Sequence, residues 1–327
     1  MRTGPDYIQL YPLLRCNRSC AFCYNQSMPF MEDMQLIDFR SLAKRLRGWP
    51  VRTIDLMGGE PTIHSDIVPL LQAAIAQGLR VNVSSNATNL PLLKKMSSLG
   101  DQVAVGISIN DRATLKATRT FIRSHRPIVK TIYTPHLDPG FVQKILESEP
   151  KTFYLIYPDA LEREGLAGTI SFDQFFPAVP DSFGVKSVGT VFCSGFIPDA
   201  AAYPDLATAR CPAGTTKLGI MPDGSVYPCN LFFGKKDFLL GNILTDPLDA
   251  IWHHPALSFF RTFTGNACPR RTCDLHAVCH GGCPAHSFAH RGSVAAPEPR
   301  CQQYGSTKQP STQKNATKRF PQARAIR

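Results

Sequence analysis

Short β-rich runs alternate with helix-like stretches in the first half of the chain, and this alternation limits the fold more than any other feature. The strand candidates are residues 7–13, 53–57, 80–85, 102–109, 127–133 and 152–157. Between them, apolar residues recur at helical spacing over residues 36–49, 66–78, 91–100, 112–125 and 140–149. Apolar strands separated by helices predict an α/β fold with a parallel sheet buried on both faces. Because crossovers share one hand, we expect the sheet to curl into a partial (β/α)6 barrel of the TIM type.

Polar motifs follow four successive strands of this predicted sheet. They are "CNRSCAFC" at residues 16–23, "GGEPT" at 58–62, "SNAT" at 85–88 and "SIND" at 108–111. The carboxyl ends of parallel strands meet at one end of a barrel, and the loops there carry the chemistry. The sequence therefore predicts a ligand site at this end of the sheet.

The alternating pattern ends near residue 160. We predict a core domain over 1–160, a bridge over 161–210, a small cysteine-rich domain over 211–304 and a disordered tail over 305–327. In the third part we expect a hairpin that turns at Asp223–Gly224 and a helix over 246–263 interrupted at Pro255. Such a segment buries little core per residue, so we expect metal sites to stabilise it.

The charge is concentrated in the tail. The chain has a net charge of +11, and residues 305–327 hold six Lys and Arg side chains and no acidic one. A basic arm for an acidic partner and a simple solvated tail both fit this composition. We favour the solvated tail and expect no nucleic-acid partner.

The sequence shows no membrane or secretion signal, and its cysteines indicate metal binding. No apolar run approaches the roughly 18 residues of a membrane helix, and the N-terminus lacks the pattern of a signal peptide. We therefore expect a cytoplasmic protein without a membrane partner. In that reducing compartment the 11 cysteines are not expected to form disulfides, and their odd number leaves one unpaired in any case. Metal ligation is the favoured interpretation.

Cys16, Cys20 and Cys23 lie within eight positions. Three readings are open: a metal site, a disulfide with one cysteine left over, and chance. A structural zinc ion takes four protein ligands, and the next Cys or His after the trio is His64. An iron–sulfur cluster with three cysteine-bound irons and one open iron fits three ligands better.

With Phe22 before its third cysteine and Tyr24 after it, the trio resembles the signature loop of the radical S-adenosylmethionine (SAM) enzymes. "GGEP" at the end of the next predicted strand strengthens the resemblance, although alone it also fits an ordinary strand-to-helix turn. The resemblance implies a 4Fe–4S cluster on the trio, whose open iron binds SAM. It further implies SAM contacts from Phe22, Gly58, Gly59, Glu60, Ser85, Asn86 and Ser108.

These residues are expected to contact different parts of SAM. The segment Gly58–Glu60 would meet the methionine end of SAM, with Phe22 near the adenine. Ser85, Asn86 and Ser108 match, less specifically, positions that contact the carboxylate and ribose. Two glycines let the backbone approach a ligand closely, and the carboxylate of Glu60 can neutralise an ammonium.

The later cysteines resemble the SPASM extension of radical SAM enzymes, which holds two auxiliary 4Fe–4S clusters. The family pattern would give one cluster Cys211, Cys229 and Cys283, and the other Cys268, Cys273, Cys279 and Cys301. The first set lacks a fourth ligand: either Cys193 completes it, which we favour, or its iron is open for substrate. One departure is visible, because four residues separate Cys268 from Cys273 where the family usually has two. One or two auxiliary clusters are therefore expected, with two favoured.

The resemblance implies an oxidoreductase or maturase that reductively cleaves SAM to a 5′-deoxyadenosyl radical and abstracts hydrogen from a substrate. A peptide or protein side chain is the expected substrate. The chain begins close to its first strand, so a separate protein is expected to present the substrate, and flavodoxin or ferredoxin to donate electrons. A dehydrogenase or decarboxylase of a small molecule or tetrapyrrole precursor is the alternative. A zinc-stapled binding protein would explain the later cysteines but not the trio or "GGEP". The sequence indicates no catalytic acid, base or hydrogen donor.

Overall fold

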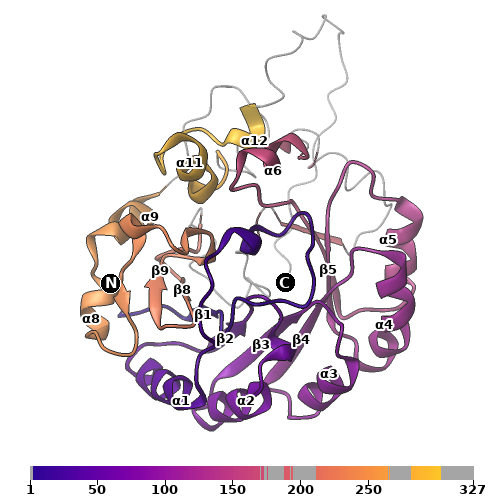
Figure 1. The fold of residues 1–327 in the computed structure, drawn as a ribbon, viewed down its shortest axis with the longest axis horizontal. Coiled ribbons are helices and arrows are strands. Elements are labelled where there is room, and N and C mark those ends of the chain that lie inside the picture. Colours follow the sequence, from indigo (N-terminus) through magenta and orange to yellow (C-terminus); the bar gives the residue numbers. More distant parts are fainter. Residues whose placement is uncertain are drawn as a thin grey trace, which may run out of the picture.

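A single ten-stranded sheet organises the described part of the chain. The computed structural model describes residues 3–169, 171–172, 175, 188–191, 193, 211–263, 265 and 281–302. The strand order is β10-β9-β8-β1-β2-β3-β4-β5-β6-β7. Neighbours from β8 to β7 run parallel, whereas β8, β9 and β10 pair antiparallel. The curved sheet with helices around its outside forms the open ring seen in Figure 1.

The strands are β1 (Tyr7–Leu10), β2 (Thr53–Leu56), β3 (Arg80–Ser85), β4 (Val103–Ser108), β5 (Ile128–Ile132), β6 (Thr152–Ile156), β7 (Val188–Val191), β8 (Lys217–Ile220), β9 (Ser225–Tyr227) and β10 (Gly241–Asn242). The helices are α1 (Leu36–Arg45), α2 (Ile67–Ala76), α3 (Leu90–Ser97), α4 (Arg112–His125), α5 (Pro139–Leu146), α6 (Arg163–Ala167), α8 (Leu248–Trp252), α9 (Ser258–Thr262), α11 (Pro284–Arg291) and α12 (Pro299–Gln302). Six strands and five helices of the predicted barrel are confirmed to within a few residues. The hairpin at Asp223–Gly224 and the helix break at Pro255 are confirmed as well.

Side-chain caps begin several of the outer helices. Asp111 accepts a hydrogen bond from the Thr114 amide (2.6 Å) at the start of α4, and Asn89 accepts one from Leu92 (3.2 Å) at the start of α3. Each cap satisfies an amide that the helix leaves without an internal partner. Within the described residues, no helix is long and apolar enough to cross a membrane.

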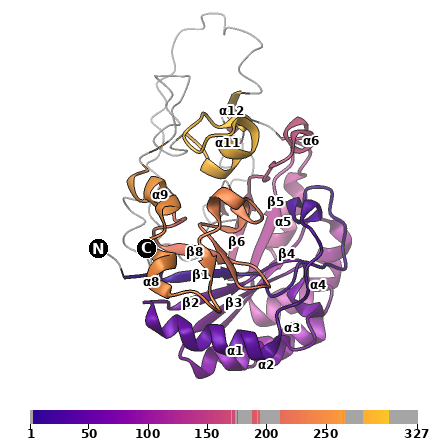
Figure 2. The ribbon, with the colours of Figure 1, turned by 60° about the vertical axis from the view of Figure 1, so that its left-hand side comes forward.

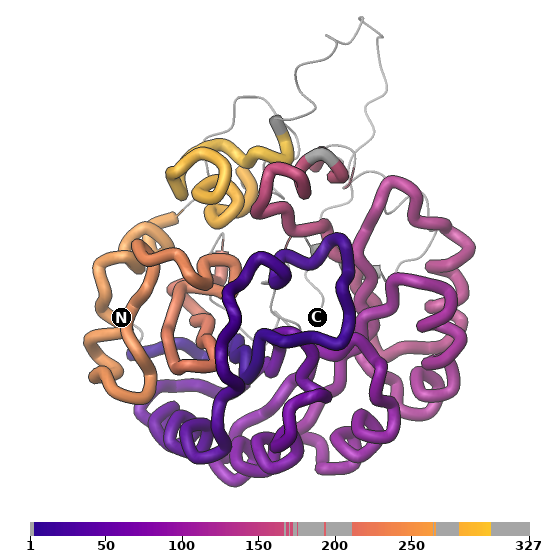
Figure 3. Tube along the Cα trace, viewed as in Figure 1, coloured from indigo at the N-terminus to yellow at the C-terminus, as the bar shows by residue number. Residues whose placement is uncertain are grey.

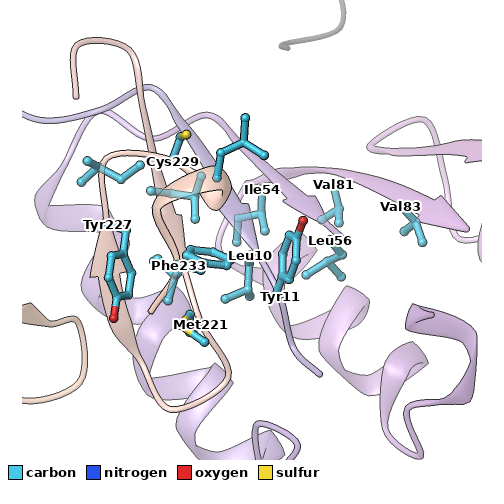
Figure 4. Close-up of a cluster of buried hydrophobic side chains, with 14 of the residues drawn as sticks. Leu10, Tyr11, Ile54, Leu56, Val81, Val83, Met221, Tyr227, Cys229 and Phe233 are labelled. Atoms are coloured by element: carbon cyan, nitrogen blue, oxygen red, sulfur yellow. The ribbon is translucent and has the colours of Figure 1, made fainter. Parts of the chain in front are cut away.

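The apolar face of the strands packs beneath the helices. Ile8 and Leu10 of β1, Ile54 and Leu56 of β2, and Val81 and Val83 of β3 are all buried completely. Several of them meet Met221, Tyr227, Cys229 and Phe233 from the cysteine-rich part in one cluster (Figure 4). The core therefore runs without interruption from the barrel into the β8–β9 hairpin.

Polar side chains occupy the other face of the same strands. The Tyr7 hydroxyl donates to Asp55 (2.9 Å), and the Lys130 ammonium donates to Ser84 (2.6 Å). Burial raises the pKa of the Asp55 carboxyl, and the charge of Lys130 opposes this effect. Burial likewise lowers the pKa of Lys130, against the effect of Asp55. The two charges compensate each other inside the barrel.

Two strands differ from the sequence-based prediction. Residues 188–191, placed in a bridge without repeats, form β7 beside β6. The hairpin assigned to a separate small domain instead begins with β8, which pairs in parallel with β1. Both strands have four residues, and both lie beyond the strand–helix alternation of residues 7–157 on which the prediction rests. The core sheet thus extends beyond the six predicted strands at both edges.

The last described helices lie against the end of β6. In Figures 1 and 2, α11 and α12 lie beside α6. Arg300, fully buried, donates to both carboxylate oxygens of Glu298 and to the carbonyl of Pro158 (3.0 Å). The guanidinium also lies 4.7 Å from the ring centre of Tyr157. These contacts fix the C-terminal helices on the barrel.

Lys130→Met tests the charge compensation in the barrel. We expect the free energy of unfolding to fall by about 1–3 kcal/mol, because the change removes the partner of half-buried Ser84 and the cation facing Asp55. The urea midpoint, followed by far-ultraviolet circular dichroism, measures the change. Adding Asp55→Asn should recover part of the loss, because the uncompensated carboxylate is then gone. An additive loss in the double variant would show that the two charges are independent.

Candidate functional site

The loop that carries Cys16, Cys20 and Cys23 lies across the carboxyl ends of the barrel strands. It is the indigo segment after β1 that passes in front of the sheet in Figure 3. Asn17 donates to the Thr88 hydroxyl (2.9 Å) beyond β3. Arg18 donates to the Thr114 hydroxyl (3.2 Å) at the start of α4. The four motifs predicted at this end of the sheet are therefore together.

All three thiols of this loop are free. Burial raises the pKa of Cys20, and the nearby Arg18 opposes the effect. Burial also raises the pKa of Cys23, while the backbone N–H of Asn25 lowers it. Each of these two thiols interacts electrostatically with Cys16. The three thiols therefore lie near one another, and the N–H contact on Cys23 is of the kind that stabilises cluster sulfurs.

Gly58 and Gly59 bring the β2 loop against the cysteine loop. The Gly59 amide donates to the Leu13 carbonyl and the Glu60 amide to the Arg15 carbonyl, both at 3.1 Å. Gly58 has a φ of +116°, and a Cβ on Gly59 would lie 1.8 Å from the Arg15 carbonyl oxygen. Only glycine permits this approach. Gly58 also accepts a hydrogen bond at its carbonyl from the Asn25 side chain (2.9 Å).

The Glu60 carboxylate is directed into the protein and is fully buried. It accepts hydrogen bonds from the Thr62 amide (3.0 Å), the Thr62 hydroxyl (2.6 Å), the Ser85 hydroxyl (2.8 Å) and the Asn86 amide (2.6 Å). The sequence suggested that this carboxylate neutralises an ammonium, but in the structure it joins the loops after β2 and β3. The carboxylate therefore accepts four hydrogen bonds from within the protein.

The other predicted SAM contacts divide into exposed and engaged groups. Phe22 is 38% exposed on the cysteine loop, so its ring is accessible to a ligand. Ser108 ends β4 and is half-buried. Ser85 is buried, and its hydroxyl donates a hydrogen bond to Glu60 and accepts one from the Ala87 amide. The Asn86 amide group donates to Asn17 and, at 3.7 Å, to the Cys16 sulfur.

Four of the later cysteines gather beside β8. The Cys193 thiol interacts electrostatically with Cys211 and Cys229, and the Cys283 thiol with Cys193 and Cys211. Burial raises the pKa of Cys229 to about 11, and the Leu231 backbone N–H lowers it. A backbone N–H, that of Ala213, acts on Cys211 in the same way. Buried thiols with N–H donors suit a cluster, because the negative sulfurs of a bound cluster need such compensation.

The structure describes only part of the predicted set of cluster ligands. Cys268, Cys273 and Cys279 lie outside the described residues. Cys301 is described and lies half-buried in α12. Among the residues with described positions, no three His, Cys, Asp or Glu side chains converge on one metal ion. A four-iron cluster is larger than one ion and holds its cysteines further apart.

A hydrogen-bonded triad connects the two cysteine sites, and sequence analysis missed it. The hydroxyls of Tyr11 and Tyr24 lie 2.6 Å apart, and the Asn230 amide donates to both, at 3.2 and 2.5 Å. Tyr24 directly follows Cys23, and Asn230 directly follows Cys229. Only the position of the two residues beside cysteines could have indicated their role.

Gly59→Ala tests the contact between the loops. We expect loss of the first cluster, about four irons per chain, because the added methyl group would displace the Arg15 carbonyl and the cysteines after it. Iron and sulfide analysis after anaerobic reconstitution measures this loss. Gly168→Ala is the matched control, because only the Gly165 carbonyl oxygen, 4.0 Å away, would lie near its Cβ. Full iron content in Gly59→Ala would contradict the interpretation.

Glu60→Gln tests the buried carboxylate. Its amide group would face an N–H or O–H donor whichever way it turned, so the loop at Asn86 should shift. We expect SAM to bind about tenfold more weakly, equal to about 1.4 kcal/mol. Calorimetric titration of the reconstituted protein gives the Kd, and Glu32→Gln on the exposed loop is the control. An unchanged Kd would mean that these hydrogen bonds do not set the geometry of the site.

Comparisons with known proteins agree with this geometry. Residues 10–134 match the model of the radical SAM superfamily, and residues 211–284 match the SPASM model, an iron–sulfur cluster-binding domain. The first match contains the cysteine loop and the Gly58–Glu60 turn. The second begins at Cys211 and ends just after Cys283.

Individual relatives have low sequence identity to this chain but match it over most of its length. The subtilosin biosynthesis protein AlbA of Bacillus subtilis is 26% identical over 82% of this chain, which spans 65% of that protein. The PqqA peptide cyclase of Xanthomonas campestris is 25% identical, over 88% of this chain and 84% of its own. The structure of Streptococcus suis SuiB bound to its precursor peptide SuiA has a TM-score of 0.70 at 18% identity, covering 92% of this chain and 76% of that one. The chain thus carries a radical SAM domain, matched over residues 10–134, followed by a SPASM domain, matched over residues 211–284.

Proposed function

We propose that this protein is a radical SAM enzyme that modifies a peptide or protein side chain. The observation that carries the proposal is the fixed cysteine loop at the mouth of the barrel, with Gly58 and Gly59 packed against it. A loop held by Asn17, Arg18 and Tyr24 presents three free thiols where a substrate inside the barrel could reach a bound ligand.

The residues at the mouth of the barrel would have separate roles. Cys16, Cys20 and Cys23 would hold a 4Fe–4S cluster, and the Gly58–Glu60 backbone would bind the methionine end of SAM. When bound, the cluster and SAM supply one-electron reductive cleavage of the sulfonium to methionine and a 5′-deoxyadenosyl radical, which takes a hydrogen atom from the substrate. Exposed Phe22 would cover the adenine, and the buried bonds of Glu60 would keep the loops in place.

We assign Cys193, Cys211, Cys229 and Cys283 to one auxiliary cluster. Their mutual electrostatic interactions and their burial favour Cys193 as the fourth ligand over an open iron. Cys268, Cys273, Cys279 and Cys301 would hold the second auxiliary cluster, as the family pattern implies. An external electron donor such as flavodoxin or ferredoxin remains part of the proposal.

A peptide substrate is supported by what the relatives are named for. The Xanthomonas protein is a PqqA peptide cyclase, AlbA serves bacteriocin biosynthesis, and the SuiB structure contains a precursor peptide. This chain covers most of the cyclase and of SuiB. Whether a separate protein presents the peptide is a further part of the proposal.

Metal analysis and SAM cleavage test this function together. The reconstituted wild type should contain about twelve irons and twelve sulfides and form 5′-deoxyadenosine with dithionite. The variant Cys16→Ala/Cys20→Ala/Cys23→Ala should lose about four of each and all SAM cleavage, because only the first cluster has an open iron. Co-expression with short peptides encoded beside the gene, followed by mass spectrometry, tests the substrate class.

Each failure has a distinct meaning. Zinc without sulfide would overturn the radical mechanism. SAM cleavage without any modified peptide, but with a modified small molecule, would overturn the peptide assignment alone. About eight irons in the wild type would remove one auxiliary cluster from the proposal.

A further inference from the structure

Lys217 is a buried lysine that interacts electrostatically with three of the auxiliary cysteines. It is the first residue of β8 and is 1% exposed. Its backbone N–H donates to the Pro212 carbonyl, and its own carbonyl accepts from the Gly214 amide, both at 3.0 Å. The turn that begins at Cys211 is therefore closed on Lys217.

The hairpin brings Lys217 beside Cys229 as well. In the antiparallel pair, Gly219 lies opposite Tyr227 and Ile220 opposite Val226. Beyond Tyr227 the chain turns over β8, and a Cβ on Gly219 would lie 2.9 Å from the carbonyl carbon of Cys229. Lys217 projects from the same face of β8 as Gly219, because side chains two residues apart in a strand share a face. Cys229 and the turn that begins at Cys211 thus both lie near this lysine.

The ammonium of Lys217 has a neutral hydrogen-bond partner. It donates to the Gln9 carbonyl oxygen at 2.9 Å, and Gln9 is itself held by a contact from its amide to the Met57 sulfur at 3.6 Å. A glutamine orients the ammonium but does not cancel its charge. The charge lowers the pKa of Cys193, Cys211 and Cys229, against the effect of burial.

Three other charged side chains also act on these thiols or on Lys217, namely Arg300, Asp55 and Asp159. Arg300, which acts on Cys283, binds both carboxylate oxygens of Glu298. Asp55 interacts more strongly with Lys130 than with Lys217. Asp159 acts on Cys193 more strongly than Lys217 does. On Cys229, Asp159 is the weakest influence and Lys217 is the main charge that opposes burial.

We propose that Lys217 is a built-in counter-cation of the auxiliary cluster on Cys193, Cys211, Cys229 and Cys283 and raises its reduction potential. The inference rests on the proposed function, because it needs that cluster. Reduction of the cluster from the 2+ to the 1+ state adds one electron, supplied in the test by dithionite. A fixed positive charge in a poorly solvated site stabilises the more negative reduced state. The potential should therefore fall when this charge is removed.

Redox titration of the reconstituted full-length protein, followed by electron paramagnetic resonance, tests the proposal. Added SAM identifies the signal of the first cluster, since its iron binds SAM, and leaves the auxiliary signals. Lys217→Met should lower one auxiliary midpoint by 59 mV or more, a tenfold change in the ratio of reduced to oxidised cluster. Lys217→Arg keeps the charge and should stay near the wild-type value.

Gln9→Glu provides a second, independent change. It leaves Lys217 in place but sets a carboxylate beside its ammonium, so it should lower the same midpoint even if Lys217→Met fails to load the cluster. Unchanged midpoints in variants that hold all their iron would overturn the role of Lys217 and leave the proposed function intact. A wild type without auxiliary iron would overturn the role of Lys217 together with the assignment of the auxiliary clusters.

Discussion

The parallel pairing of β8 with β1 is the contact on which the arrangement of the cysteine sites depends. It joins residues more than 200 positions apart, with Tyr7 opposite Lys217 and Leu10 opposite Ile220. Because a one-residue slip in register would turn every side chain to the opposite face, this pairing fixes where Lys217 lies. It also sets the hairpin so that Asn230 meets Tyr11 and Tyr24. The auxiliary cysteines are thereby placed relative to the mouth of the barrel through strand pairing rather than through a flexible linker.

Burial gives the two cysteine sites different electrostatic settings. Cys16 is exposed, and Cys20 and Cys23 are half-buried in a loop, as a site that must admit a ligand requires. Cys229 and Cys283 are buried, where negative sulfur is costly without nearby positive groups. Backbone N–H groups and the two buried cations, Lys217 and Arg300, supply this compensation. The same physical difference would favour ligand binding at one cluster and protection from solvent at the other.

The sequence predicts the barrel well because its strands are apolar and its helices amphipathic, and both signals survive without tertiary context. The cysteine trio and the Gly58–Gly59 turn were also predictable, since few residue types serve there. The four hydrogen bonds that the Glu60 carboxylate accepts were not predictable, because they depend on how the loops after β2 and β3 meet. Lys217 carries no sequence signal either, because a lysine in a short strand normally lies on the surface. Such residues are recognised only through long-range pairing.

Aromatic packing also stabilises the described part of the cysteine-rich segment. Phe232 packs on Phe238 with ring centres 4.3 Å apart, and Phe260 and Phe288 approach these rings at 5.4 and 4.9 Å. Aromatic contacts of this kind bury large apolar areas, and they continue the core that begins at β1. Clusters would then organise loops on a hairpin already held by apolar packing and by β1. In such an arrangement the hairpin presents Cys211, Cys229 and Lys217 in their final register before any iron is bound.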